Sequence, residues 1–158
     1  MILVLIGVSW RPKPAHGAFL TGLPLAELIL GIAILAVASM CLGLFVSAVV
    51  STSEKAMPFL VLFTMVQVVL SGGVVPLQGK AGLEQFAMIA PSRWGFAAAA
   101  TTVNLNKISP QLGGISDTLW NQTSQNWLRD VGVMIGMALL LALLTWFFVR
   151  RLGPRRRE

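Results

Sequence analysis

The chain has 158 residues, of which 56% are hydrophobic and only 11% are charged, and its mean hydropathy is +0.78. Soluble domains contain about 45–50% apolar and about 25% charged residues, so this composition excludes an ordinary soluble fold and predicts an integral membrane protein. Much of the net charge of +6 follows the last apolar run, where it suits a membrane flank, and we predict no nucleic-acid partner.

The N-terminal half contains one apolar segment that is too short to cross a bilayer and two that are long enough. Residues 1–9 would extend about a dozen ångströms as a helix, against a hydrocarbon core about 30 Å thick, so we interpret them as the end of a truncated helix. Residues 24–50 and 57–76 are predicted transmembrane helices. Glu27 falls in a first turn, where the helix dipole favours an anion near the interface, and a proton relay is the alternative.

A long connection of mixed character, residues 77–130, opens the C-terminal half. Its two short apolar pieces, residues 81–90 and 94–103, have lengths typical of interfacial or re-entrant helices, which predicts a loop with short helices. Residues 131–149 form the last predicted transmembrane helix. The predicted fold class is therefore all-α, a polytopic membrane helix bundle with three full transmembrane helices plus the end of a fourth.

Basic residues directly after the last predicted span set the orientation. Arg150 and Arg151 begin a cluster of five arginines, and basic residues that flank spans are retained on the cytoplasmic side. Counting back through three spans places residues 51–56 inside and residues 77–130 outside, although two basic residues near the N-terminus oppose this orientation. We therefore predict a multi-pass protein of the cell inner (plasma) membrane with a cytoplasmic C-terminus.

The residues that could carry chemistry form no reactive constellation. The chain has no GxxxxGK[ST] phosphate-binding loop, so we do not expect it to hydrolyse ATP itself. His16 is the only histidine and Cys41 the only cysteine, and the carboxylates are scattered near predicted helix ends. This inventory supplies neither a nucleophile with its base nor a metal-ligand cluster. We expect no catalytic and no metal site.

Small residues recur at helical spacing in two of the predicted spans. Such spacing permits the close approach of helix backbones in a membrane, and chance is the alternative in a glycine-rich chain. The predicted packing positions are Ser39, Gly43 and Ser47 in the first span, and Gly132 and Gly136 in the last.

A polar stripe runs along one face of the second predicted span. Thr64, Gln67 and Ser71 follow one another at i, i+3 and i+7, and Gln67 is the most costly of the three to expose to lipid. This face is therefore expected to meet protein or a water-filled cavity. Both interpretations, a pathway lining that includes Gln67 and an ordinary hydrogen bond between helices, remain open at this point.

Three stretches, in this order and spacing, resemble the membrane domain of type-2 ABC exporters of the G subfamily. They are GLFVSAVVSTSEKAMP at residues 43–58, VLSGGVVP at residues 69–76 and APSRWGF at residues 90–96. The resemblance is strongest to actinobacterial exporters that join forkhead-associated domains, an ABC ATPase and this membrane domain in one polypeptide. The resemblance covers nearly the whole chain.

The resemblance implies roles for the second full span, which corresponds to a family helix that lines a central cavity at a two-fold interface. An apolar plug at the outer end of that helix separates the cavity from the exit. Matched by position, the residues that face the cavity are Val61, Met65 and Val68, and the gate residues are Gly73 and Val74, with Val75 beside them. Relatives place two bulky leucines at the plug, so the resemblance implies that either Val75 substitutes or a space lies open beside Gly73.

The resemblance also implies partners and a function. The chain is expected to be the membrane-spanning part of an ATP-driven exporter that forms the translocation pathway for an amphiphilic or lipid-like substrate. ATP and magnesium would be held by an ABC nucleotide-binding domain in the same or a separate chain. A second membrane domain would complete a dimer in the lipid bilayer. The alternative is a structural or regulatory membrane subunit without its own transport path.

Overall fold

The computed structural model describes residues 17–19, 23–50, 53–75, 77, 80, 82–108 and 117–152, without the side chains of 53–56 and 152. The predicted end of a truncated helix, residues 1–9, lies outside these ranges. All regular structure in the described ranges is helical, with no strand, which confirms the all-α prediction. The helices are α2 (Pro24–Val49), α3 (Ser53–Leu70), α4 (Leu83–Ala87), α5 (Pro91–Val103), α6 (Leu105–Ile108), the 3₁₀ helix η2 (Thr118–Trp120) and α7 (Ser124–Leu152).

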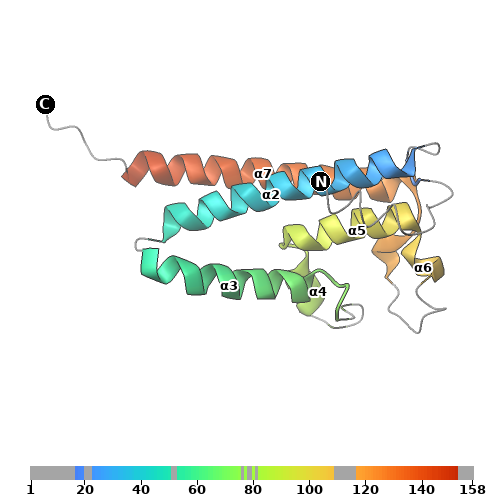
Figure 1. Cartoon of the computed structure of the whole chain (residues 1–158), viewed down its shortest axis with the longest axis horizontal. Coiled ribbons are helices and arrows are strands. Elements are labelled where there is room, and N and C mark those ends of the chain that lie inside the picture. The colour runs from blue at the N-terminus through green and yellow to red at the C-terminus, as the bar shows by residue number, and fades with distance from the viewer. Residues whose placement is uncertain are drawn as a thin grey trace, which may run out of the picture.

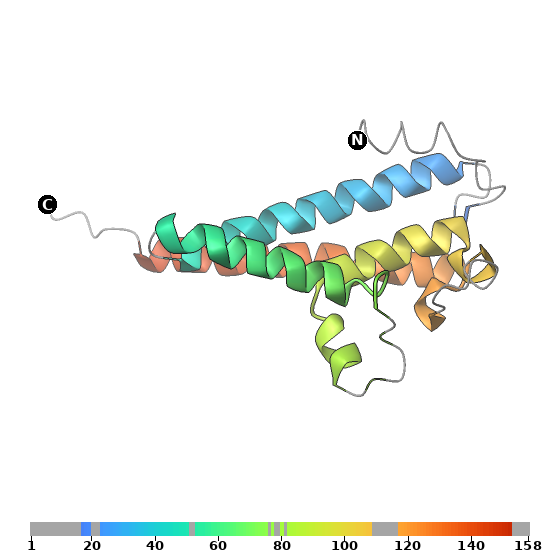
Figure 2. The same ribbon diagram turned by 60° about the horizontal axis from the view of Figure 1, so that its bottom comes forward.

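Two long helices, α2 and α7, run side by side along the molecule (Figure 1). The short helix α5 packs against both of them, in the half of the molecule far from the C-terminus. Helix α3 occupies the other half and makes more contacts with α5 than with α2 (Figure 2). The bundle is therefore tied together by α5, because α5 contacts each of the three longer helices.

Helix α3 differs in its bounds from the predicted span 57–76. It begins at Ser53, so Pro58 lies beyond its first turn, where a proline costs one backbone hydrogen bond. It ends at Leu70, two residues before Gly72, whose φ of +83° is a left-handed conformation that breaks the helix. Residues 71–75 follow as a bend rather than as the end of a helix.

Helix α7 is longer than the predicted span 131–149 and begins at Ser124. Its first turn is polar, and a sequence search for apolar residues alone misses such a turn because a helix can continue beyond the bilayer into water. The connection before it therefore ends at residue 123 and carries α4, α5, α6 and η2.

Two helices have the length and apolarity needed to cross a bilayer. The most apolar 18-residue windows of Pro24–Val49 and Ser124–Arg151 have mean hydropathies of 2.7 and 2.4, and only 17% of either window is buried within the chain. The core helix of a soluble protein would be mostly buried, so we assign these surfaces to lipid or to other membrane helices. The apolar part of α3, Met57–Leu70, is shorter. A third full span is not confirmed and stays a prediction.

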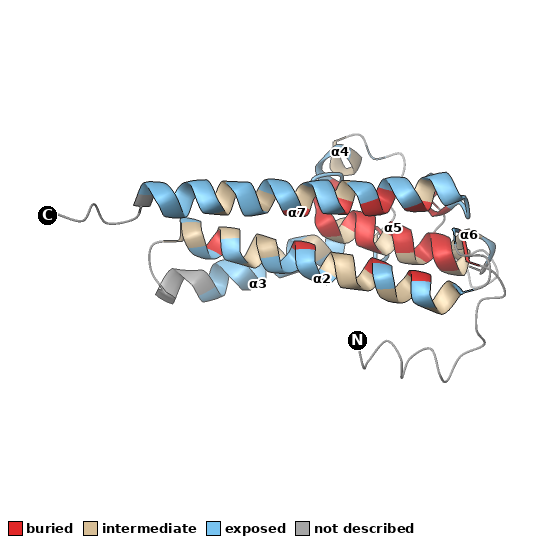
Figure 3. Ribbon diagram, turned by 90° about the horizontal axis from the view of Figure 1, so that it is seen from above, coloured by how far each residue is buried: buried red, intermediate tan, exposed pale blue. Residues whose placement is uncertain are grey.

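Burial is concentrated where α5 lies between α2 and α7 (Figure 3). Nine of the thirteen residues of α5 are buried, whereas none of the described side chains of α3 is. One cluster joins α5 to the start of α7, and a smaller one joins α5 to η2. The buried members are Ala18, Trp94, Ala98, Trp127, Val131 and Met134 in the first, and Ala97, Ala100 and Trp120 in the second.

Candidate functional site

The face of α3 that the resemblance assigns to the pathway has no cover within the described part of the chain. Val61, Met65 and Val68 are 57%, 63% and 48% exposed. Large apolar side chains with such exposure are stable in a membrane protein only against lipid, a second protein surface or an apolar substrate. The structure thus leaves this face available for contact with a partner or a ligand.

Of the polar stripe on α3, only Gln67 is used for packing against another helix. Gln67 Oε1 accepts a hydrogen bond from the Ser92 N–H at 3.2 Å, and the Gln67 carbonyl accepts one from Ser92 Oγ at 2.7 Å. These two bonds join α3 to the first turn of α5. Thr64 Oγ1 donates to the Leu60 carbonyl at 2.8 Å, so its hydroxyl is satisfied within α3 itself. Of the two interpretations left open by the sequence, the structure supports the interhelical hydrogen bond.

Side chains of α5 occupy the space beside the predicted gate. A Cβ added to Gly73 would lie 2.7 Å from Cζ and 2.8 Å from Cε2 of Phe96. The expectation of open space beside Gly73 is therefore wrong, because the ring of Phe96 already fills it. Val74 is 64% exposed and Val75 is half-buried, so the described gate segment presents Val74 outward.

Among the described helices, the predicted small-residue packing is not found. A Cβ added to Gly43, Gly132 or Gly136 would meet nothing within 4 Å, and Ser39 and Ser47 are exposed. The i, i+4 spacing alone does not say which helix, if any, lies opposite. Other glycines lie at helix contacts. A Cβ added to Gly31 would lie 3.9 Å from Ala98 Cβ, and Gly95 lies against the side chain of Leu35.

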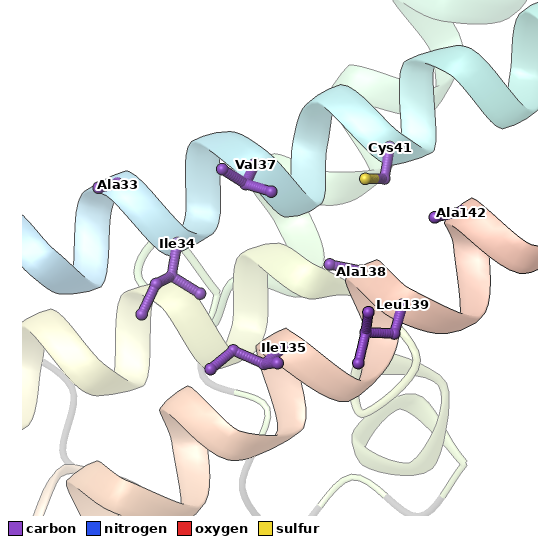
Figure 4. A pocket seen from close by; sticks show the side chains of 8 residues that line it. All are labelled: Ala33, Ile34, Val37, Cys41, Ile135, Ala138, Leu139 and Ala142. Atoms are coloured by element: carbon purple, nitrogen blue, oxygen red, sulfur yellow. The ribbon is translucent and has the colours of Figure 1, made fainter.

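Cavities lie between the described helices. One of about 280 Å³ separates α2 from α3, and Ser39 and Gly43 line it together with Thr64, Gln67 and Ser92. A second, of about 300 Å³ and almost entirely apolar, lies between α3, α7 and the start of α5. A third of about 320 Å³ runs between α2 and α7, where apolar side chains of both helices and the half-buried Cys41 line it (Figure 4). The small residues of α2 therefore border a space rather than a close helix contact.

A buried ion pair, which the sequence reasoning missed, holds α5 to the connection that precedes α7. Arg93 Nη2 donates to Asp117 Oδ2 at 2.5 Å, and the two side chains are 1% and 4% exposed. Asp117 Oδ1 also accepts from the Leu119 N–H at 3.0 Å and so caps η2. The sequence did contain one indication of this ion pair: Arg93 lies between two apolar segments, and a charge that is buried there requires an opposite charge nearby.

Asn106 fixes the backbone of Asp117. Its Oδ1 accepts from the Asp117 N–H at 3.1 Å, and its Nδ2 donates to the Asp117 carbonyl at 2.7 Å and to Asn121 Oδ1 at 2.9 Å. A further buried carboxylate, Asp130 in α7, is paired with Arg129 at 3.6 Å. Charged and amide side chains are thus gathered at one end of the bundle, around α5, α6 and η2.

At the same end of the bundle, Glu27 joins α2 to residues 18 and 19 and to α5 through hydrogen bonds. It is fully buried, and its Oε1 accepts from Thr102 Oγ1 at 2.7 Å and from the Ala18 N–H at 3.2 Å, while Oε2 accepts from the Phe19 N–H at 3.1 Å. The predicted position in the first turn of α2 is correct. The carboxylate binds two backbone N–H groups and a hydroxyl of α5 instead of water, and its depth near the membrane interface stays a prediction.

These features define a class of protein: a helical membrane domain whose apolar helices face outward and whose described residues contain no cluster of metal-ligating side chains. The chain belongs to the ABC-2 type transporter family, whose sequence profile matches residues 2–103. The family assignment confirms the resemblance found in the sequence. It identifies the chain as membrane-domain sequence of an ABC transporter, the permease part rather than the ATPase.

One curated relative extends the match beyond α5. The ABC transporter ATP-binding/permease protein Rv1747 of Mycobacterium tuberculosis is 37% identical over 139 residues, which is 88% of this chain and 16% of that protein. The chain therefore spans less than a fifth of the length of this relative. No solved structure was found to match the chain.

Proposed function

We propose that the chain forms part of the translocation pathway of an ATP-driven exporter for amphiphilic or lipid-like substrates, with the apolar face of α3 along the path. The observation that carries this proposal is the exposure of Val61, Met65 and Val68 on a helix whose Gln67 is already hydrogen-bonded to α5. Apolar walls with few polar groups are typical of sites for such substrates.

The proposal places ATP and magnesium on an ABC nucleotide-binding domain. Its support is the family assignment together with the name of the relative, which combines ATP-binding and permease functions in one protein. A second membrane domain would face the exposed side of α3 across a two-fold axis. ATP-driven closure of the nucleotide-binding domains would then favour the outward-open cavity, because the nucleotide binds the closed arrangement more tightly.

Tryptophan substitutions test the pathway. In the complete transporter in vesicles, Val61→Trp and Met65→Trp should lower both export and substrate-stimulated ATP hydrolysis, because added bulk would fill the apolar path. Leu143→Trp is the matched control, since Leu143 is 62% exposed but lies on α7. Normal export by both α3 variants would refute the pathway. A stable complex whose properties do not depend on ATP would instead support a structural or regulatory subunit.

Labelling from either side of the membrane tests the proposed orientation. Cysteines at Gln125 and Arg151, both exposed at opposite ends of α7, should react with impermeant reagents from outside and inside respectively. Cys41, half-buried within α2, is the internal control and should be protected. Reaction of both new cysteines from one side would exclude α7 as a span.

A further inference from the structure

Two consecutive glycines after α3 each lie against a side chain of α5. Gly72 is buried with a φ of +83°, and a Cβ added there would overlap Arg93 Nη1. A Cβ added to Gly73 would lie 2.7 Å from the ring of Phe96. Arg93 and Phe96 are three residues apart on one helix face, so a single face of α5 covers both glycines.

The two covering side chains are in turn held by η2. Arg93 forms the buried ion pair with Asp117 at 2.5 Å, and Phe96 meets Trp120 edge-to-face with ring centroids 5.4 Å apart. Asp117 caps η2 and Trp120 is its last residue, so one short element supports both contacts. The result is two parallel contact columns, Gly72–Arg93–Asp117 and Gly73–Phe96–Trp120.

We propose that these two contact columns make Arg93 and Phe96 positioning residues for the segment 71–75, and thereby couple the connection around η2 to the exit gate. This inference rests on the proposed function and on the resemblance, which assigns Gly73, Val74 and Val75 to the exit gate. A displacement of η2 would move the guanidinium and the ring, and the two glycines that they cover would follow.

Besides the two side chains of α5, the buried Leu77 lies close to the segment, with its Cδ1 3.4 Å from a Cβ added to Gly72. The described internal hydrogen bonds of the segment are local: Ser71 Oγ donates to the Val68 carbonyl at 2.7 Å and accepts from the Gly73 N–H at 3.3 Å. Val74 is 64% exposed, and the described side chains of α3 include no buried one. The contacts from α5 therefore contribute to the position of the segment, and they are the ones that come from another helix.

The columns differ in stiffness. The ion pair is anchored by Asn106, which bonds both backbone groups of Asp117 at 2.7 and 3.1 Å. Phe96 and Trp120 make an edge-to-face aromatic contact without an ion pair, and Trp120 is 1% exposed. A ring can slide along its neighbour at less cost than a buried ion pair can separate, so the Phe96 column is the part that yields when the gate opens.

The test measures accessibility at Val74 in the complete transporter, in a background without other reactive cysteines. Val74→Cys reports on the segment through its rate of reaction with an impermeant thiol reagent. Adding Phe96→Ala should raise that rate roughly fivefold, because the segment loses its cover. Asp117→Asn, which keeps the shape of the side chain and its capping ability, should raise the rate as well. Phe147→Ala is the control, since Phe147 is 47% exposed near the other end of α7.

A second measurement separates positioning from a general loss of structure. Gly73→Ala should alter the labelling rate in the wild-type background, where its methyl group meets Phe96, and should be nearly silent once Phe96→Ala has removed the ring. Equal effects of Gly73→Ala in both backgrounds would overturn the inference. Rates within about twofold of the Phe147→Ala control for both Phe96→Ala and Asp117→Asn would also overturn it.

The labelling rate requires no transport, so it fails separately from the proposed function. Altered labelling with unaltered export in Phe96→Ala would keep the positioning role and remove the gate. Unaltered labelling together with lost export in Met65→Trp would keep the pathway and remove the positioning role. The expected result is altered labelling together with export that falls relative to ATP hydrolysed.

Discussion

Helices α3 and α5 show opposite relations between apolarity and burial. α3 consists largely of big apolar side chains, yet none of its described side chains is buried. α5 contains an arginine, hydroxyl side chains and a run of alanines, and most of it is buried. The difference follows from the surroundings, because lipid is as apolar as leucine and gives no reason to hide large side chains. Small and polar residues instead fill the contacts between helices, where backbones approach and hydrogen bonds form.

The largest effect expected from this comparison is the loss of the buried charge pair in α5. Asp117→Ala should lower the free energy of unfolding by about 3–5 kcal/mol, because it leaves the Arg93 guanidinium buried without its counter-ion. Denaturant unfolding in detergent measures the change. Lys107→Ala, at an exposed cation, should stay within about 0.5 kcal/mol of wild type.

A double variant sharpens that result. Arg93→Met with Asp117→Leu replaces both charges by apolar side chains and should regain most of the stability lost in Asp117→Ala. If Asp117→Ala were as stable as Lys107→Ala, the ion pair between Arg93 and Asp117 would not stabilise the fold.

The next effect concerns Glu27, another buried carboxylate at the same end of the bundle. Glu27→Ala removes the acceptor for two backbone N–H groups and for the Thr102 hydroxyl, and should cost about 2–3 kcal/mol. Thr102→Val removes one of these bonds while keeping the shape of the side chain, and should cost about 1 kcal/mol. Thermal unfolding of both variants side by side checks the ratio, and equal losses would show that the contacts with residues 18 and 19 contribute nothing.

A smaller effect distinguishes glycines at helix contacts from free ones. In Gly95→Ala the new Cβ would lie 2.6 Å from Leu35, and the overpacking of about 1–3 kcal/mol should exceed the gain in helix propensity of about 1 kcal/mol. Gly136→Ala meets nothing within 4 Å and should be neutral or stabilising. If Gly136→Ala destabilises the assembled protein but not the separated chain, that face packs against a partner.

The smallest effect is expected on the outward face of α7. Leu143 is 62% exposed, so Leu143→Ala should change the free energy of unfolding by less than about 0.5 kcal/mol although it removes a large apolar side chain. Met134→Ala is the buried counterpart on the same helix and should cost about 2–5 kcal/mol. Similar losses for both would mean that Leu143 is covered in the complete protein.

The sequence predicts the long helices well because each is one long apolar run. The start of α7 at Ser124 and the end of α3 at Leu70 were not predicted, since the first depends on a polar turn beyond the apolar run and the second on the backbone conformation of Gly72. The family resemblance was correct because it used the order and spacing of whole motifs.

The contacts that build the candidate site could not be predicted in the same way. Arg93 and Asp117 are 24 residues apart, and no sequence periodicity relates two positions at that separation. Phe96 fills the space beside Gly73 through a contact between α5 and the bend after α3, which the periodicity of one helix does not contain. The sequence indicated that Gln67 needs a polar partner. That this partner is Ser92 could be known only from the packing of α3 on α5.

The contact between Gly73 and Phe96 also limits how this membrane domain can change in evolution. The side chains of residues 73 and 96 occupy the same space. A larger side chain at residue 73 therefore requires a smaller one at residue 96. Relatives with a leucine at the position of Gly73 should therefore carry a small residue at the position of Phe96. The side-chain volume would then have passed from α5 to the bend after α3 without a change in the total volume at this contact.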